Sequence, residues 1–514
     1  MEHGQTTRVA GVGAAVGVVT VGFALLCLLG GGCARELEGT PSPVRKTHLG
    51  ELPGDHRRRS VAISSGGDAY AFVSTTPEGD RVVGPDGPGP LYARCERPLF
   101  GPEGQRVYYW AQPHADPSEA GPEDAPRDTF VLVADRTPLA TGFRSPGTLV
   151  LSDDGARWAA LGIDGNVPET SLLFFLDGER QEDWLDVSQP VFGPADGDAA
   201  GVVVMLAKGA DGAVRLVVDG QERQRFAAPE VACAVDAMPE EGEPDLWRHV
   251  VQPLADGGFL LGTRDADGWG LYREDRRLAS YELSFRDAAS TKCLTGKSVL
   301  LLEYVRAARD APVAIWWERG RLGEEGRWRV MRDGTPIDEY RCDDILRSQP
   351  PEIGPGGEHY AYACIARDAD GSTKITVVQD GVRHGPYAEV WGLALSDDGE
   401  HLAYGAIEVP VPIDGASGSG ELPELPWSFY RDGQRQPGQH HALWRPRLNA
   451  DGSHMAWQAQ VAEGSAGVLG VDHRRITDFD ELLWGPTFEG DDRVAWVIRR
   501  GRRLTRIDFT YGLD

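Results

Sequence analysis

The stretch SDDGEHLAY, residues 396–404, places a glycine turn before a large apolar, a small and an aromatic residue. The same order returns in NADGSHMAW, GPGGEHYAY, SDDGARWAA, SSGGDAYAF and EGDDRVAW, which begin at Asn449, Gly354, Ser152, Ser64 and Glu489. Aligned on the turn, the small position in these six copies is alanine: Ala71, Ala159, Ala361, Ala403, Ala456 and Ala495. Gly201 takes the same position in a weaker copy, and Tyr108 and Leu300 fill it with larger residues. Short apolar runs after Gly and Asp turns predict β-strands. The chain is therefore built from a repeated strand unit.

A second marker follows each first one after roughly fifteen to thirty residues. It is a β-branched or aromatic run that stops at Asp-Gly or a near relative, as at Asp177, Asp219, Asp333, Asp380, Asp432 and Asp472. Asp-Gly between apolar runs is a strong hairpin signal, because Gly adopts positive φ without steric cost. Each unit then holds two hairpins, and four strands in about forty to sixty residues are typical of a propeller blade.

The small residue has a geometric reason. Packed sheets lie only about 10 Å apart, so alanine in the second strand lets the next sheet approach. We predict an all-β fold, a β-propeller of four-stranded antiparallel blades with roughly 7 to 10 blade-like units. These units form one large ring or two smaller propellers, and a boundary between two propellers would lie within residues 236–325.

The N-terminal sequence predicts that the protein is exported from the cytoplasm. Residues 9–32 carry no charge, and a run of that length can cross a bilayer. Arg8 precedes the run, and three glycines lead from it to Cys33. Export signals likewise end in small residues before their cleavage site. We expect a signal or anchor segment over 1–33, a flexible tether over 34–60 and the repeat region over 61–514. Because the last unit lacks one strand, the run RRRSVAIS at 57–64 is a candidate for the missing edge.

Two resemblances refine these expectations. The join from Leu29 to Cys33 resembles the lipobox of bacterial lipoproteins, although Gly30 stands where that family usually has leucine. The resemblance implies an acylated Cys33 and a membrane-anchored body facing the periplasm or cell surface. An uncleaved transmembrane anchor and a plain secretory signal are the alternatives. The repeat resembles the WD40-like repeats of TolB-type propellers and of propellers in prolyl-oligopeptidase-like enzymes, with the turn proline mostly replaced by aspartate.

Composition and motifs exclude several functions. The net charge is −27 without a basic stripe, so we expect no nucleic-acid partner. The spacing HExxH, a phosphate loop and a strand-bound GxGxxG do not occur, and residues 415–420 lack the spacing of a nucleophile elbow. We therefore nominate no catalytic residue, metal or cofactor. His359, His401 and His454 share one position after the turn, which favours polar surface residues over a shared metal site.

Three tryptophans repeat near the start of the innermost strand of their units: Trp391, Trp444 and Trp484. Large rings at this position fill the wedge between blades, or they form an aromatic rim that receives a peptide or sugar. We predict these three as binding residues, with Arg445 and Arg447 as nearby polar contacts.

Five cysteines remain beyond the export segment, and in an oxidising compartment most should pair. Cys342 precedes the first strand of a unit and Cys364 lies late in the antiparallel partner strand, so we predict a bridge between them. Cys233 with Cys293 is a second candidate pair, which leaves Cys95 free.

The leading hypothesis is a non-catalytic envelope lipoprotein whose propeller binds a protein or a peptide or glycan polymer. The rival is an envelope enzyme, such as a hydrolase, lyase or quinone-type propeller, with a loop-built site on the ring axis. A purely structural role is the third possibility. The sequence does not indicate an oligomeric state.

Overall fold

The computed structural model describes residues 43–511 apart from 115–128, 165–171, 182–183, 185, 194–200, 210, 212, 227–249, 255, 257, 266–267, 274–275, 284–297, 301–305, 309–310, 320–326, 338–341, 347, 369–371, 409–425, 445 and 491. In these residues the regular structure consists of strands β1 to β44, without a helix. It follows that no helix of the described part is long and apolar enough to span a membrane. The predicted export segment and Cys33 lie outside the described residues.

The strands form ten units within the described part of the chain. Six sheets hold one unit each, and two longer sheets hold two units each. In five units the innermost strand is split into two short strands. The first four units comprise β2 Ala62–Ile63, β3 Tyr70–Thr76, β4 Gly79–Gly84, β5 Gly87–Pro88; β6 Arg94–Cys95, β7 Leu99–Phe100, β8 Val107–Gln112, β9 Phe130–Ala134, β10 Thr137–Phe143; β11 Thr148–Leu151, β12 Trp158–Ile163, β13 Leu172–Leu176, β14 Glu179–Arg180; and β15 Asp186–Val187, β16 Val191–Phe192, β17 Val203–Lys208, β18 Val214–Val218, β19 Gln221–Phe226.

Units 5 to 8 lie in the two longer sheets. β23 and β24 pair in parallel and join units 5 and 6, while β33 is the last strand of unit 7 and continues as the first strand of unit 8. Their strands are β20 Val250–Pro253, β21 Phe259–Asp265, β22 Gly268–Arg273, β23 Arg276–Leu283; β24 Ser298–Leu300, β25 Arg306–Ala307, β26 Ala314–Arg319, β27 Trp328–Arg332, β28 Thr335–Pro336; β29 Asp344–Ile345, β30 Glu352–Ile353, β31 Tyr360–Arg367, β32 Thr373–Gln379, β33 Val382–Leu395; and β34 Leu402–Glu408, β35 Ser428–Arg431, β36 Gln434–Arg435.

The last of the ten units brings together the first and the last strand of the described chain. Unit 9 consists of β37 Ala442–Leu443, β38 Arg447–Leu448, β39 Met455–Gln460, β40 Gly467–Val471 and β41 Arg474–Phe479. Unit 10 consists of β42 Glu481–Phe488, β43 Arg493–Arg500, β44 Arg503–Thr510 and, as its outer strand, β1 Val44–Glu51.

The closing strand differs from the prediction. β1 pairs with β44, with Val44 opposite Phe509 and Glu51 opposite Arg503. The edge strand is therefore Val44–Glu51 and not residues 57–64. The predicted tether, residues 34–60, is also wrong in part, because residues 44–51 form this strand. The misreading has a physical cause, because an outer edge strand is half exposed and carries polar residues such as Arg45 and Lys46.

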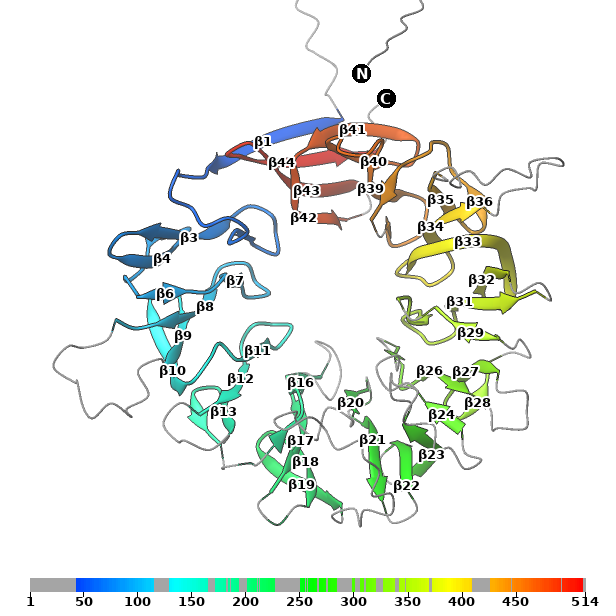
Figure 1. Cartoon of the computed structure of the whole chain (residues 1–514), viewed down its shortest axis with the longest axis horizontal. Helices are drawn as coiled ribbons and strands as arrows, with labels where there is room; N and C mark the ends of the chain where they lie inside the picture. Colours follow the sequence, from blue (N-terminus) through cyan, green and yellow to red (C-terminus); the bar gives the residue numbers. More distant parts are fainter. Residues whose placement is uncertain are drawn as a thin grey trace, which may run out of the picture. The chain divides into compact units, whose positions relative to one another are not determined.

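Residues 43–512 form one compact unit. Neighbouring sheets contact one another from unit to unit, and β2 of unit 1 lies against β42 of unit 10, which closes the ring (Figure 1). The described residues of the region 236–325, where a boundary was predicted, form unit 5 and the strands β24 to β26 of unit 6, which belong to one sheet. The β-propeller prediction is thus confirmed, with ten units in a single ring.

The repeated alanines hold this packing together. All six are fully buried: Ala71, Ala159, Ala361, Ala403, Ala456 and Ala495. Ala403 of unit 8 packs in one cluster with Met455 and Trp457 of unit 9, and Ala456 of unit 9 packs with Trp496 of unit 10. Larger side chains at these positions would push the sheets apart, as the prediction required.

The antiparallel order gives every unit two distinct ends. Connections from the first to the second strand and from the third to the fourth lie at one end, which we call the turn end. Connections from the second to the third strand and from unit to unit lie at the opposite end, which we call the crossover end.

Candidate functional site

The turn end is organised by aspartates of the third-to-fourth strand turns. Seven of them have φ between 46° and 54°: Asp135, Asp177, Asp219, Asp333, Asp380, Asp432 and Asp472. Aspartate tolerates this left-handed conformation better than most residues. In unit 8 the Asp432 carboxylate accepts a hydrogen bond from the Leu402 N–H at 2.8 Å, and the same bond recurs at the other six aspartates. Each Asp thus ties the outer hairpin of its unit to the second strand.

The three repeated histidines complete this arrangement. His359, His401 and His454 hydrogen-bond through Nδ1 to Asp380, Asp432 and Asp472 at 2.9, 2.8 and 2.8 Å. Acceptance of this bond by Asp380 raises the pKa of His359 above its ordinary value. Each histidine pairs with the aspartate of its own unit, and the described residues contain no cluster that could hold a metal ion.

The histidines also explain the turn glycines. A Cβ on Gly399 would lie 2.9 Å from the Cβ of His359, and one on Gly452 would lie 2.4 Å from the Cβ of His401. Both glycines have positive φ, so a side chain there would be strained as well as crowded. His454 instead stacks its ring on Tyr511 at 3.9 Å between centroids. These histidines are packing residues between neighbouring units.

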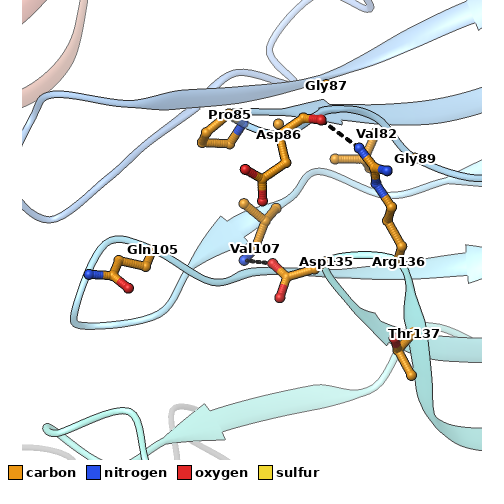
Figure 2. A pocket seen from close by; sticks show the side chains of 11 residues that line it. Val82, Pro85, Asp86, Gly87, Gly89, Gln105, Val107, Asp135, Arg136 and Thr137 are labelled. Atoms are coloured by element: carbon orange, nitrogen blue, oxygen red, sulfur yellow. Dashed lines mark hydrogen bonds between the residues drawn. The ribbon is translucent and has the colours of Figure 1, made fainter.

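A pocket of about 260 Å³ lies at the turn end between units 1 and 2 (Figure 2). Two of its charged groups, Arg136 and Asp135, already have partners. The Arg136 guanidinium donates to the Asp86 carbonyl at 2.5 Å, and Asp135 accepts from the Val107 N–H at 2.9 Å and pairs with Arg106 at 3.6 Å. Because these groups hold the turns of the two units, this pocket is a poor candidate for ligand binding.

The crossover end carries a larger pocket of about 500 Å³, where units 7, 8 and 9 meet. Seven of its nine lining residues are apolar, and Trp391 is 42% exposed. The lining comprises Leu346, Ser348, Ile375, Glu389, Val390, Trp391, Trp427, Ala442 and Leu443. Concave apolar surface with a few polar groups is the usual form of a binding site. We call this the tryptophan pocket.

A local irregularity of β33 presents Trp391. The register against β34 shifts between Trp391 and Ala394, and Gly392 has φ of 72°. The Gly392 N–H donates to Oε1 of Gln349, a buried side chain of unit 7, at 2.7 Å. Such a bulge re-aims a side chain, and the bond from the neighbouring unit fixes it. Gln349 is thus a positioning residue for Trp391.

The next tryptophan in the series, Trp444, is also exposed, at 41%. Its neighbour Leu443 lines the pocket and packs against Gly405, whose Cβ would lie 2.4 Å from Leu443 Cδ1. Trp444 itself is not a lining residue. Among its predicted polar partners, Arg447 is exposed in β38, and Arg445 lies outside the described residues.

Trp484 occupies a different environment. Its ring lies against the turn of unit 1, where a Cβ on Gly67 would be 2.6 Å from the indole, and the Arg506 guanidinium lies 5.9 Å from the ring centre. Arg506 in turn pairs with Glu489 and Asp508. Trp484 therefore fills the wedge between units 10 and 1, whereas Trp391 and Trp444 keep the exposure expected of contact residues.

Sequence reasoning missed Trp427, Leu443 and Gln349. Trp427 directly precedes β35, the third strand of unit 8, and exchanges backbone hydrogen bonds with His440. Gln349 lies eight residues before the turn glycine Gly357, the offset that carries tryptophan in the next two units, and Leu443 directly precedes one of those tryptophans. Only the tryptophans themselves were singled out at this offset, and Trp427 lies outside the repeated turn pattern.

The predicted disulfide is present between Cys342 and Cys364, whose Cα atoms are 5.4 Å apart. It links the crossover between units 6 and 7 to β31, next to Leu346 of the tryptophan pocket. Cys95 is a free, buried thiol whose pKa burial raises to about 12. Cys233 and Cys293 lie outside the described residues.

No protein-family model matches the chain. No curated protein matches it either. Among solved structures, it is similar to dipeptidyl peptidase 4 of Porphyromonas gingivalis, with 12% identity, TM-score 0.35, and coverage of 68% of this chain and 57% of that one. It is similar to a putative TolB from Agrobacterium tumefaciens (14%, TM-score 0.22, covering 38% and 69%). A third is the WD40 domain of SCAP from fission yeast (9%, TM-score 0.30, covering 92% and 100%).

The chain spans little more than half of the peptidase it matches. At these TM-scores and identities the likenesses carry no argument about function. Function has to be argued from the residues of the crossover end.

Proposed function

We propose that this chain is a non-catalytic binding protein, and that its tryptophan pocket receives an apolar side chain from a segment of a partner protein. The observation that supports this is the exposure of Trp391, 42%, at a pocket with seven apolar lining residues. Covering the exposed part of one indole removes on the order of 100 Å² of apolar surface from water, worth about 2.5 kcal/mol.

The lining favours a peptide over a glycan. Among the described lining residues, the side-chain hydrogen-bonding groups are those of Ser348 and Glu389 and the two indole N–H groups. A sugar ring would bring several hydroxyl groups, and each one buried without a partner costs about 1 to 3 kcal/mol. An aromatic or aliphatic side chain meets no such cost.

The same lining supports binding over catalysis. General acid–base chemistry needs at least one well-placed proton donor and acceptor, usually two titratable groups. In the described wall of the pocket, Glu389 is the one titratable side chain, and it is exposed. The rival hypothesis of an envelope enzyme has no comparable set of residues there.

A peptide titration tests this proposal. The probes are synthetic hexapeptides of Ser and Gly with one central Trp, Leu or Ser, and maltohexaose as a glycan. Trp391→Ala should weaken binding of the Trp and Leu peptides at least tenfold, which corresponds to about 1.4 kcal/mol. Trp444→Ala is the matched control, because Trp444 is equally exposed but does not line the pocket.

Two results would contradict the proposed binding of a peptide in the tryptophan pocket. Equal binding by the wild type and Trp391→Ala, with unchanged thermal unfolding, would remove the pocket as the site. Saturable binding of maltohexaose without peptide binding would replace the peptide by a glycan.

We also propose that the N-terminal segment exports the body and that acylated Cys33 anchors it, on the resemblance to a lipobox. Labelling cells that make the protein with an alkyne fatty acid tests this. The wild type should take up the label and Cys33→Ser should not; labelling of both would refute the assignment.

A further inference from the structure

A third pocket, of about 230 Å³, lies at the crossover end where the ring closes. Its wall comes from the segment between β1 and β2, from Arg97 in the connection between β6 and β7, and from the strands β42 and β43. The lining residues are Leu52, His56, Arg58, Arg59, Val61, Arg97, Glu481, Leu482, Leu483 and Arg499. We call it the arginine pocket. It is separate from the tryptophan pocket and shares no residue with it.

The arginine pocket is strongly positive in a strongly negative protein. Four arginines face one carboxylate in its wall, while the whole chain has a net charge of −27. Arg499 pairs with Glu481 at 2.7 Å, which neutralises that carboxylate. No described residue forms an ion pair or hydrogen bond with the side chains of Arg58, Arg59 or Arg97. Three guanidinium groups are therefore available to a ligand.

The loop that carries two of these arginines is held in place at both ends. Arg57 forms an ion pair with the buried Asp80 at 3.2 Å, and its N–H donates to the Val73 carbonyl at 2.8 Å. Ser60 is buried, donates its hydroxyl to the Arg57 carbonyl and accepts from the Val73 N–H. Arg58 and Arg59, by contrast, are exposed. The loop thus anchors its ends in the body and presents its two middle residues.

The backbone at Arg59 gives a second, independent indication. Eight non-glycine residues of the described chain have positive φ, and seven are the turn aspartates; the eighth is Arg59, at 63°. This conformation costs a residue with a Cβ about 1 kcal/mol, and glycine would avoid that cost. Unusual backbone conformations retained by non-glycine residues are concentrated at binding sites.

We infer that the arginine pocket binds the phosphate group of a ligand. A guanidinium presents its N–H groups in a planar fork that matches phosphate oxygens. A carboxylate carries one charge and is satisfied by one arginine, whereas three unpaired guanidinium groups match a dianion with several oxygen acceptors. The phosphate belongs either to a small free molecule or to a lipid headgroup, and the two sources share this chemistry.

Binding measurements on the full-length protein test the inference. The probes are inorganic phosphate, followed by calorimetry, and vesicles of phosphatidylcholine with and without phosphatidic acid, followed by flotation. The variants are Arg58→Gln, Arg97→Gln and Arg59→Asn, since Asn tolerates positive φ. Each should weaken phosphate binding about tenfold, the size expected for one charge-assisted hydrogen bond. Arg45→Gln is the control, because Arg45 is an exposed arginine of β1 outside the pocket.

The outcomes separate the sources. Saturable phosphate binding that the pocket variants weaken supports a free phosphate compound, and binding of phosphatidic acid vesicles alone supports a lipid headgroup. Failure of the wild type to bind either probe overturns the inference. Equal weakening by Arg45→Gln also overturns it, because the attraction would then be unspecific charge. The variants share the wild-type thermal unfolding midpoint if only the ligand contacts are lost.

Discussion

The turn end and the crossover end of this ring are built from the same strands but by opposite rules. At the turn end, units 7, 8 and 9 repeat one set of contacts, in which a histidine joins an aspartate of its own unit. At the crossover end Trp391 is exposed, whereas the ring of Trp484, which holds the equivalent sequence position, fills a wedge against the Gly67 turn of unit 1. Repetition here marks packing, and departures from it mark surface open to ligands.

The difference follows from what each end must satisfy. The tight turns of the turn end need positive φ and a partner for buried backbone N–H groups, and aspartate followed by glycine supplies both. The crossover connections have no common length, so their side chains are free to differ between units. The tryptophan pocket and the arginine pocket both lie at this irregular end.

The largest expected effect comes from breaking the repetition at the turn end. Gly452→Val puts a branched side chain at φ of 65° and within 2.4 Å of the His401 Cβ. Left-handed strain of about 1 to 2 kcal/mol and overpacking of about 1 to 3 kcal/mol should together lower the free energy of unfolding by about 2 to 5 kcal/mol. Urea unfolding of the wild type and the variant measures this difference in the free energy of unfolding.

The matched control is Gly464→Val. Gly464 has φ of 67° but nothing within 4 Å of its Cβ position, so it isolates the backbone strain. We expect a loss of about 1 to 2 kcal/mol there. Equal losses at both sites would mean that contact between neighbouring units contributes nothing, and the contrast between the ends would fail.

The disulfide near the tryptophan pocket provides a test at the crossover end. Replacing both Cys342 and Cys364 by Ser removes a bridge across 22 residues. Constraint of the unfolded chain by a loop of this size is worth about 3 kcal/mol. The variant should unfold at lower urea and should no longer respond to reductant, while the wild type should lose stability on reduction. A wild type insensitive to reductant would show that the bridge does not stabilise the fold.

The smallest effect concerns pH at the turn end. Because the pKa of His359 is raised in the folded state, protonated His359 stabilises the fold, fully so below its ordinary pKa of about 6.5. This stabilisation is lost as the pH rises through the folded-state pKa. The stability difference between the wild type and His359→Gln should therefore shrink from pH 5.5 to pH 8.5. A difference that grows with pH would contradict the His359–Asp380 pairing.

Much of the fold could be predicted from the sequence because its signals are local and repeated. The turn aspartates and the alanine four or five residues beyond each turn glycine mark the same strands in unit after unit, for example Asp432 and Ala403 in unit 8. The closing strand could not be predicted this way. Val44–Glu51 has no turn marker, and its half-exposed edge has the composition of a linker.

The candidate site was predicted only in part. Trp391 was found because it lies at a fixed distance from a repeated turn. The rest of its pocket includes Leu346 and Ser348 of unit 7 and Leu443 of unit 9, residues far apart in sequence that meet only when three units pack together. The arginine pocket is of the same kind, because it joins Arg58 near the start of the body to Arg499 near its end.

The sequence alone determined that the chain is a propeller of four-stranded units, in one ring or two, since each unit repeats its own turn chemistry and its own small residue. Only the tertiary structure decided how many units close the ring, which strand closes it and where its pockets lie. The reason is physical: turns and strand faces depend on neighbours within a few residues, whereas ring closure and pockets depend on contacts between units that no local pattern encodes.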